Sequence, residues 1–334
     1  MIMSEVESKF MKRALVLAEF GPISDNPRVG AVVVRNGEIV GEGFHRGAGT
    51  PHAEVEAIES AGDRARGGTI YVTLEPCSHY GRTGPCTEAI LDAGLATVIY
   101  AQSDPTEQAR GGGEVLADAG VHVIGGYHLE ESERLNRAWN HWRVTGKPFV
   151  TWKFAQSLDA RVAERSGVRT RISGQNSQEA THILRSQVDA IVVGTRTANI
   201  DNPMLTARNN KGALHPRQPI RVVVGMSELR ADSLLMNSPG GEVIHMRTHD
   251  PKLVVDQLAA RGVRHILVEG GPKLAGAFLE AGVINQIITV LAPVTFSAGP
   301  PALQVMLKEP YSVSRIHWQR LGPDLVINGI LEPR

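Results

Sequence analysis

Alternating and helically spaced apolar positions divide the chain into a regular series of strands and helices. Apolar side chains recur at three- or four-residue intervals over residues 4–19, which predicts an amphipathic helix. Two β-branched runs, residues 29–34 and 39–44, flank Asn36-Gly37 and are typical of a hairpin. Further elements are expected at residues 51–61 (helix), 69–74 (strand), 86–93 (helix), 97–101 (strand), 113–119 (helix), 121–124 (strand) and 130–144 (helix). This order predicts a sheet with helices on both faces.

A break at residues 145–148, Thr-Gly-Lys-Pro, marks a predicted domain boundary between residues 147 and 148. Beyond it, strands are expected at residues 149–154, 190–193, 220–224, 242–245, 265–268, 286–291, 312–318 and 325–331, and helices at residues 175–187, 253–261 and 273–281. The second half therefore also has an α/β pattern. A total of 334 residues agrees with two domains, because single domains rarely grow so large.

Composition narrows the class of protein. The 35 basic and 35 acidic residues cancel, so the chain lacks the overall positive field that draws proteins to nucleic acid. No apolar run reaches the roughly 20 residues of a membrane-spanning helix. The chain has two cysteines, and its start does not resemble a secretory signal. We therefore expect a cytoplasmic protein with free thiols and with neither a membrane nor a nucleic-acid partner.

Three short motifs at the ends of predicted elements carry groups that bind zinc. His52-Ala53-Glu54 opens a helix, Glu75-Pro76-Cys77 ends a strand, and Cys86 opens another helix. In zinc deaminases, one imidazole and two thiolates hold Zn²⁺ and leave the fourth position to water. A carboxylate that is not a ligand, here Glu54, then carries protons from water to the departing ammonia. The sequence predicts hydrolytic removal of an amino group from a heterocyclic base.

Local sequence also predicts how these groups are held. Thr50 is expected to cap the helix, with Pro51 in its first turn. At about 100° per residue, His52 and Glu54 would lie on nearly opposite sides of a regular helix, so the Glu54 side chain would have to bend back. A purely structural zinc site is the main alternative, and it would need a fourth protein ligand, for which His79 is the nearest candidate.

Longer motifs add a family resemblance. The stretch YVTLEPCSHYGRTGPC, residues 71–86, has eight residues between its cysteines, where nucleoside and tRNA deaminases usually have two. With Asn26-Pro27-Arg28-Val29-Gly30 and His52-Ala53-Glu54-Val55, it resembles the bifunctional deaminase/reductases of bacterial riboflavin biosynthesis. Motifs of the second half fit the same family, and the resemblance covers almost the whole chain. They include Lys153 with Ser157-Leu158-Asp159, Asp201-Asn202-Pro203 and Val268-Glu269-Gly270-Gly271.

The resemblance implies a fold and two activities. Residues 1–147 would form a cytidine-deaminase-like three-layer αβα domain, and residues 148–334 a dihydrofolate-reductase-like α/β domain. The first would use zinc to remove the 2-amino group of a diaminopyrimidine ribosylamine phosphate. The second would use NADPH to reduce the ribosyl group to a ribityl chain. The partner would be this small-molecule substrate, and a homo-oligomer is a possible assembly.

The same resemblance assigns residues by position. In the deaminase, the zinc ligands are His52, Cys77 and Cys86, the proton carrier is Glu54, and the substrate contacts are Asn26, His45 and Arg82. In the reductase, the groups at the reaction centre are Lys153, Asp201 and Glu269. Substrate positions are Ser173, Arg185, Leu205, Arg208 and Glu269, and cofactor positions are Ala155, Arg171, Thr197, Asp201, Gly270, Gly271, Pro272, Lys273, Leu274 and Ala275. Backbone amides at the glycine-rich turn could face a pyrophosphate, although an ordinary βα turn has the same residues.

The reductase half departs from the family pattern at several positions. Ala160 replaces a usual glycine, Arg169 a small polar residue, Arg171 a tryptophan, and Gly225 an aspartate. Arg169 or Arg171 is expected to pair with the 2′-phosphate of NADPH. Two other functions stay open. A nucleoside or tRNA-base deaminase fused to an α/β binding domain is disfavoured by the neutral charge and the cysteine spacing, and a zinc-stabilised binding module would release no ammonia.

Overall fold

In the computed structural model, residues 5–81, 83–107 and 109–334 are described. They belong to two units, Met1–Thr145 and Gly146–Arg334, so the division falls two residues before the predicted boundary. Ser4, the predicted start of the first helix, and Arg82 lie outside the described residues. Within the described residues, no helix combines the length and apolar character needed to cross a bilayer.

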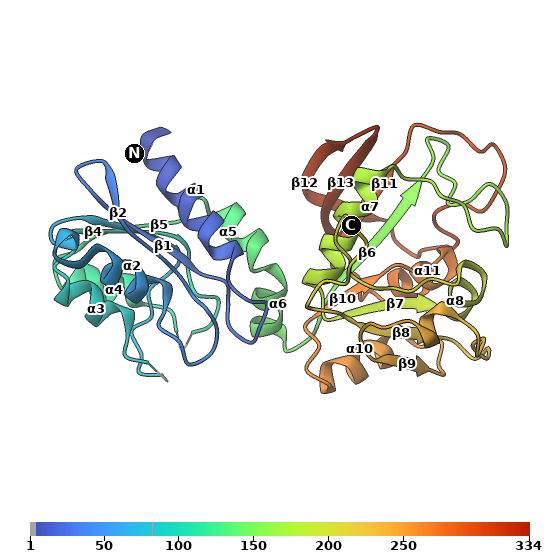
Figure 1. Ribbon diagram of the computed structural model, residues 1–334, viewed down its shortest axis with the longest axis horizontal. Helices are drawn as coiled ribbons and strands as arrows, with labels where there is room; N and C mark the ends of the chain where they lie inside the picture. The colour runs from blue at the N-terminus through green and yellow to red at the C-terminus, as the bar shows by residue number, and fades with distance from the viewer. Residues whose placement is uncertain (1–4, 82, 108) are drawn as a thin grey trace. The chain divides into compact units, whose positions relative to one another are not determined.

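The N-terminal unit has three layers around a five-stranded sheet of order β2-β1-β3-β4-β5 (Figure 1). The strands are β1 (Gly30–Arg35), β2 (Glu38–Phe44), β3 (Thr69–Leu74), β4 (Thr97–Gln102) and β5 (His122–Gly125). The helices are α1 (Glu5–Glu19), α2 (Ala53–Ala61), α3 (Cys86–Asp92), α4 (Gly112–Asp118), α5 (Leu129–Leu135) and α6 (Arg137–Thr145), with a 3₁₀ turn at Gly62–Ala65. On β1, Ala31 and Val33 pack with α2, α3 and α4, whereas Val32 and Val34 pack with α1. The strand alternation thus sorts two cores onto the two faces of the sheet.

Helix α2 lies close to β2 because two glycines of that strand carry no side chain. A Cβ on Gly41 would lie 2.2 Å from the Ala57 carbonyl oxygen, and one on Gly43 would lie 2.5 Å from the Ala53 carbonyl oxygen. Both distances are far below van der Waals contact. The glycines therefore fix the position of α2, and with it the positions of His52 and Glu54 at its start.

The predicted helix over residues 130–144 is two helices, α5 and α6, separated at Asn136. The Asn136 side chain accepts from the Arg28 backbone N–H at 2.9 Å and donates to the Arg28 carbonyl at 2.9 Å. This two-point contact holds the segment before β1 against the junction of the two helices. The apolar pattern alone did not predict this break, because the contact at Asn136 is made with Arg28, which lies 108 residues earlier in the sequence.

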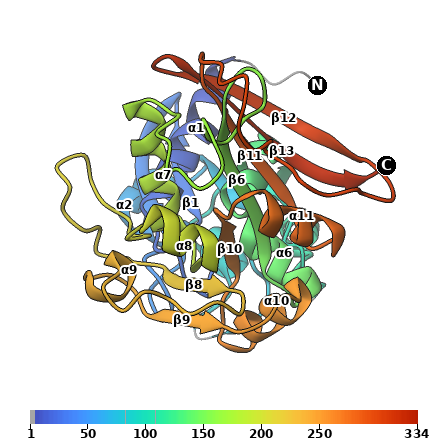
Figure 2. The ribbon, with the colours of Figure 1, turned by 90° about the vertical axis from the view of Figure 1, so that its right-hand side faces the viewer.

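The C-terminal unit is built on an eight-stranded mixed sheet of order β12-β13-β11-β6-β10-β7-β8-β9. The strands are β6 (Phe149–Gln156), β7 (Ala190–Gly194), β8 (Ile220–Val224), β9 (Val243–Met246), β10 (His265–Val268), β11 (Gln286–Leu291), β12 (Tyr311–Leu321) and β13 (Asp324–Pro333). Strands β11, β6, β10, β7, β8 and β9 run parallel, and β13 and β12 form an antiparallel hairpin at one edge (Figure 2).

Helices cover both faces of this sheet. They are α7 (Gln175–Gln187), α8 (Thr195–Asp201), α9 (Leu234–Asn237), α10 (Pro251–Ala260) and α11 (Pro272–Glu280). The core on one face joins the sheet to α10 and α11, and the core on the other joins it to α7, α8 and α9. The sequence analysis did not predict α8 and α9. Both are short, and α8 carries a single fully buried side chain, Ala198, so it has no apolar repeat to read.

Candidate active sites

In the N-terminal unit, the three predicted zinc ligands lie together. The ligand atoms of His52, Cys77 and Cys86 all lie within 4.8 Å of one another. Nδ1 of His52 is 3.1 Å from Sγ of Cys86 and 3.6 Å from Sγ of Cys77. Two thiols and one imidazole at this spacing form the donor set of a catalytic zinc site, so the residues present fit the metal.

The structure corrects the predicted start of α2. Thr50 does not cap the helix, because its hydroxyl donates to the Gly47 carbonyl at 2.8 Å. His52 is itself the N-cap residue, with extended backbone angles (φ −73°, ψ 160°), and the helix begins at Ala53. The objection that His52 and Glu54 point apart on a helix therefore does not apply, because His52 lies outside the helical turn.

Glu54 and His79 differ in their relation to this cluster. Glu54 is buried and contacts the Cys86 side chain, but it is not one of the three residues that form the cluster. Burial raises the pKa of its carboxyl group. Among the described residues, the metal-ligating group does not include His79, which is exposed. This arrangement favours a three-ligand site with a free position over a closed structural site.

The predicted substrate contacts Asn26 and His45 lie beside the zinc ligands. The His45 ring meets the His52 ring edge-on, with 5.5 Å between centroids. Its Nδ1 lies 3.2 Å from the Pro51 carbonyl, and its Nε2 lies 2.9 Å from Nδ2 of Asn26. Because a carbonyl only accepts, Nδ1 carries the proton and Nε2 accepts from Asn26. Asn26 is thereby oriented at the edge of the site.

Glu75, which precedes Pro76 and Cys77 in the motif, has an anchoring role that sequence reasoning did not assign. Its carboxylate is buried and accepts from the backbone N–H groups of Asp104 (3.2 Å), Gly111 (3.0 Å) and Gly113 (3.1 Å). These three bonds tie the segment after β4 and the start of α4 to the end of β3. The loop that carries Cys77 therefore starts from an anchored residue.

In the C-terminal unit, a large pocket lies at the carboxyl ends of the parallel strands, where open α/β sheets bind ligands. Its volume is about 1010 Å³, the upper end of the usual range for a single small-molecule site, which suits a substrate together with a dinucleotide. It brings together most of the predicted reductase residues. These are Lys153, Ala155, Arg171, Ser173, Arg185, Thr197, Asp201, Arg208, Glu269, Gly270, Gly271, Pro272, Lys273 and Leu274.

Two predicted residues are not among those that line this pocket. Leu205 is 3% exposed and belongs to the core beneath α8, with a left-handed backbone (φ 52°). Ala275 is fully buried in the core on the inner side of α11. Both support the walls of the pocket, and any contact of either with a ligand stays a prediction.

Glu269 and Arg185 form a bidentate ion pair within the pocket. Arg185 Nε donates to one carboxylate oxygen at 2.8 Å and Nη2 to the other at 2.7 Å, with only 14% and 12% of the two side chains exposed. Burial alone would raise the pKa of Glu269, but the Arg185 charge outweighs it, and the pKa lies below its usual value. Burial lowers the pKa of the nearby Lys153 ammonium, against the attraction of Glu269. Glu269 is thus a fixed negative charge.

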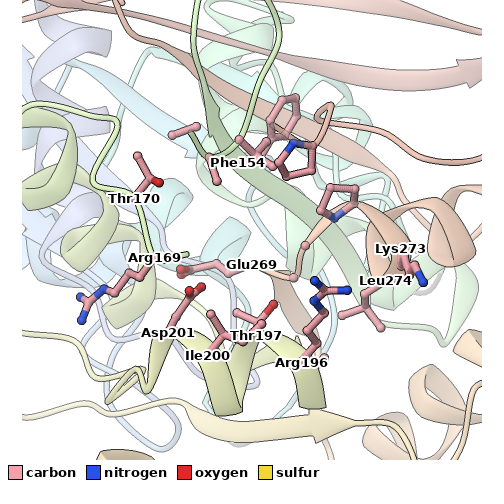
Figure 3. A pocket seen from close by; sticks show the side chains of 18 of the residues that line it. Phe154, Arg169, Thr170, Arg196, Thr197, Ile200, Asp201, Glu269, Lys273 and Leu274 are labelled. Atoms are coloured by element: carbon pink, nitrogen blue, oxygen red, sulfur yellow. The ribbon is translucent and has the colours of Figure 1, made fainter. Parts of the chain in front are cut away.

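Asp201 has the opposite environment. It ends α8, the helix that follows β7, and Figure 3 shows it reaching towards Glu269 with Arg169 alongside. Burial raises the pKa of its carboxyl group, and the Arg169 charge offsets this only in part. The two carboxylates of one pocket therefore differ in how readily they hold a proton.

The end of the pocket at α11 fits a dinucleotide. Gly271 is the N-cap of α11 and Pro272, which has no N–H, is the first helical residue, so the amides of Lys273 and Leu274 start the helix within the pocket wall. A Cβ on Gly271 would make an ordinary contact of 3.5 Å with Oγ1 of Thr197, which places this turn beside α8. Such a helix start favours a phosphate group. Gly225, which has a φ of 132°, lines the same pocket after β8.

Two polar residues of this pocket were missed or only partly described by the sequence analysis. His182 lies three residues before Arg185 on α7, so helical spacing could have placed both on one face. Arg208 was predicted as a substrate position, but the lack of a carboxylate partner for its guanidinium group among the described residues was not predicted. Its Nε is buried without a partner in the described part of the chain, and Nη1 reaches only the Met204 sulfur at 3.8 Å. Unlike Arg185, it has a guanidinium group available for an anion.

Comparisons with known proteins match each of the two halves of the chain to a protein family. Residues 148–327 match the RibD C-terminal domain, and residues 4–102 match the cytidine and deoxycytidylate deaminase zinc-binding region. The chain is 41% identical over 315 residues to riboflavin biosynthesis protein RibD of Mycobacterium tuberculosis, covering 92% of each chain. It is 36% identical over 361 residues to RibD of Escherichia coli, covering 96% of this chain and 98% of the relative.

Solved structures show the same likeness over the full length. A deaminase/reductase from Thermotoga maritima matches with a TM-score of 0.83 and 30% identity, covering 98% of this chain and 99% of that one. RibD of Acinetobacter baumannii matches with a TM-score of 0.79 and 29% identity. The predicted pair of α/β domains, the zinc and NADPH cofactors and the two activities are confirmed. The chain therefore belongs to the RibD family of riboflavin biosynthesis enzymes, which join a zinc-dependent pyrimidine deaminase to an NADPH-dependent reductase.

Proposed function

We propose that His52, Cys77 and Cys86 hold zinc in the deaminase and that Glu54 carries the protons of the reaction. The observation that supports this most directly is the convergence of three ligand atoms within 4.8 Å, with buried Glu54 next to Cys86 but outside the set. When bound in such a site, zinc activates water for attack on a heterocyclic carbon. Glu54 would accept a proton from the attacking water and return it to the leaving amino group.

Asn26 and His45 orient the pyrimidine next to the metal ligands. The bond from Asn26 to His45 fixes one amide N–H and leaves the amide oxygen of Asn26 to accept from a ring N–H or amino group. His45 is almost fully buried and supports this orientation rather than filling the site itself. Arg82, the predicted phosphate or ribose contact, lies outside the described residues and stays a prediction.

In the reductase, Asp201 exchanges protons and Glu269 holds charge. NADPH supplies the hydride for the sugar carbon when it is bound. The neighbouring Lys153 and the Arg185–Glu269 pair set the charge around that carbon, and Arg208 binds the substrate phosphate with the guanidinium that no carboxylate occupies. Ser173 lines the same pocket. Opposite shifts in the pKa of two carboxylates are the usual sign of divided roles.

The residues that would hold the cofactor follow β6, β7 and β10. Residues 270–275, at the turn into α11, would bind its pyrophosphate, and Ala155 and Thr197 would contact its nicotinamide end. Arg171 was predicted as a cofactor position as well, and the charge of Arg169 or Arg171 was expected to pair with the 2′-phosphate. In Figure 3, Arg196 lies on the other side of Glu269 from Arg169, nearer Lys273, so it is a further candidate for the 2′-phosphate.

The two activities should separate in single variants of the full chain. Glu54→Gln should retain zinc, because Glu54 is not a ligand, and should slow ammonia release by roughly 10²–10⁴-fold. With the deaminated intermediate supplied, it should still oxidise NADPH normally. Asp201→Asn should release ammonia at the wild-type rate while NADPH oxidation falls. A Glu54→Gln enzyme that deaminates at near wild-type rate would show that another group carries the proton.

Cofactor choice needs its own comparison. We expect a higher kcat/KM with NADPH than with NADH, because the pocket wall carries exposed cations that can pair with a 2′-phosphate. The double variant Arg169→Ala/Arg171→Ala and the single variant Arg196→Ala should be compared. Whichever loses the preference identifies the contact, and equal use of both cofactors by the wild type would contradict the expectation.

The setting of the enzyme can also be proposed. Cys77 and Cys86 are free thiols, which a reducing cytoplasm preserves for metal binding. Equal numbers of basic and acidic residues disfavour a nucleic-acid partner and favour the small-molecule substrate alone. Strand β12 forms a sheet edge with exposed Ile316 and Trp318, which suits pairing with a second copy. Sedimentation of wild type and Trp318→Glu would test the homo-oligomer.

A further inference from the structure

His182 lines the reductase pocket, and one of its two ring nitrogens is left as a potential hydrogen-bond acceptor. Its Nδ1 lies 3.0 Å from the Thr206 carbonyl oxygen, which also receives Nη1 of Arg185 at 3.2 Å. A carbonyl cannot donate, so Nδ1 carries the proton. In the neutral ring, Nε2 then has only a lone pair, and no described side chain donates a hydrogen bond to it.

The charges around His182 keep this ring neutral. Arg185 of α7 and Arg208 of the segment after α8 both lie near it, and Glu269 at the end of β10 is the nearby anion. Burial first, and then the two arginines, lower the pKa of His182 below its usual value. The imidazole is therefore an uncharged acceptor at neutral pH, set among cationic groups.

Donors outnumber acceptors among the charged groups near His182. Lys153, Arg185 and Arg208 have only donors, which suit the oxygen atoms of a phosphate. Each carboxylate oxygen of Glu269 already accepts one bond from Arg185, which leaves these oxygens less available to a further donor. A sugar hydroxyl that donates its proton here would find Nε2 of His182 as the matching group.

We propose that Nε2 of His182 accepts a hydrogen bond from a ribose hydroxyl of the reductase substrate, which makes His182 a specificity-determining residue. The proposal rests on the reductase function argued above. A pocket that hydrogen-bonds a substrate hydroxyl loses affinity when the partner is removed, because the bond formed on binding is not replaced. The competing explanation is that His182 only supports the Thr206 segment through Nδ1.

Two amide substitutions separate these explanations. The amide nitrogen of asparagine reaches about as far as Nδ1, so His182→Asn can keep the bond to Thr206 while removing the acceptor. The amide oxygen of glutamine reaches about as far as Nε2, so His182→Gln can keep an acceptor while losing that bond. His249→Asn is a matched control, because His249 lines the same pocket after β9, three strands away from β10.

The assay follows NADPH oxidation by the full chain supplied with the deaminated intermediate. His182→Asn should raise the KM for the intermediate about tenfold, equal to the net worth of one hydrogen bond, and leave the KM for NADPH and the melting temperature unchanged. His182→Gln should keep the KM for the intermediate within about threefold and lower the melting temperature. His249→Asn should leave the KM for the intermediate unchanged.

Other outcomes would overturn the assignment in distinguishable ways. An unchanged KM in His182→Asn, or a larger rise in His182→Gln than in His182→Asn, would show that the ring only supports Thr206. A rise in the KM for NADPH alone would place the cofactor, not the sugar, against Nε2. A wild-type enzyme that does not oxidise NADPH with this intermediate would refute the reductase function itself, and the role of His182 with it.

Discussion

The ion pair between Arg185 and Glu269 should stabilise the reductase unit far more than any surface pair of the same chemistry. Glu269→Gln keeps the size of the side chain but leaves the Arg185 guanidinium buried without an anion. Removing one partner of a buried pair costs about 3–5 kcal/mol, because the remaining charge stays desolvated. Domains of this kind have roughly 5–15 kcal/mol of total stability, so the loss is a large fraction. At about 2–4 °C per kcal/mol, the reductase transition should fall by roughly 6–20 °C.

The chain offers a matched control in Glu242→Gln. Glu242 pairs with Arg261 at 2.7 Å, but their side chains are 54% and 46% exposed, against 12% and 14% for Glu269 and Arg185. Exposed pairs contribute about 0–1 kcal/mol, so this variant should melt within about 2–4 °C of the wild type. Differential scanning calorimetry of the full chain, with and without a zinc chelator, would assign the transitions, because the zinc-binding residues lie in the N-terminal unit. Equal shifts in the two variants would refute the argument from burial.

Three further outcomes follow from particular contacts. Oγ1 of Thr83 lies 3.4 Å from Nε2 of His52, so Thr83→Val should weaken zinc binding about 10–100-fold in chelator competition, and Thr83→Ser should retain the wild-type affinity. Equal zinc affinities of Thr83→Val and the wild type would show that this contact does not support the metal site. Ala160 has a φ of 59°, a left-handed angle that is unfavourable for alanine. Ala160→Gly should stabilise the reductase unit by about 1 kcal/mol and raise its melting temperature, because relief of this strain outweighs the greater entropy that glycine gives the unfolded chain. Asp201→Asn should not lower, and should slightly raise, the melting temperature at pH 7–8, since a carboxyl whose folded pKa is raised destabilises the fold when ionised. That gain should vanish as the pH falls through the carboxyl pKa, and a gain that grows towards acid would contradict it.

The zinc site could be predicted because its chemistry lies in short contiguous motifs. A histidine, a non-ligand glutamate and two cysteines at element ends define the donor set without any knowledge of distant contacts. What the motif did not show was the local backbone. The same residues fit a helix that begins at Pro51 or at Ala53, and the choice depends on the extended conformation of His52, which lets its ring reach the thiols.

The reductase site was harder to predict because its interactions join distant segments. Arg185 and Glu269 are 84 residues apart in the sequence, and no periodic pattern predicts that they form an ion pair. Both were assigned through the family resemblance, which gave positions but not the bond between them. Short helix α8 was missed for a related reason, since its stability comes from packing on β7 and β8 rather than from its own sequence.

The difference between the two reductase carboxylates follows from where their charges can be satisfied. Glu269 meets a guanidinium in bidentate geometry, so its ionised form is stabilised more than burial penalises it. For Asp201, the exposed Arg169 is the charge that opposes the effect of burial, and burial prevails, so the protonated form is favoured relative to an ordinary aspartate. A group that gives up and regains a proton during a reaction must be able to adopt both its protonated and its ionised form. A group that only positions a neighbouring cation has to stay ionised. The proposed division of roles follows from this difference, because Asp201 can change its protonation state more readily than Glu269.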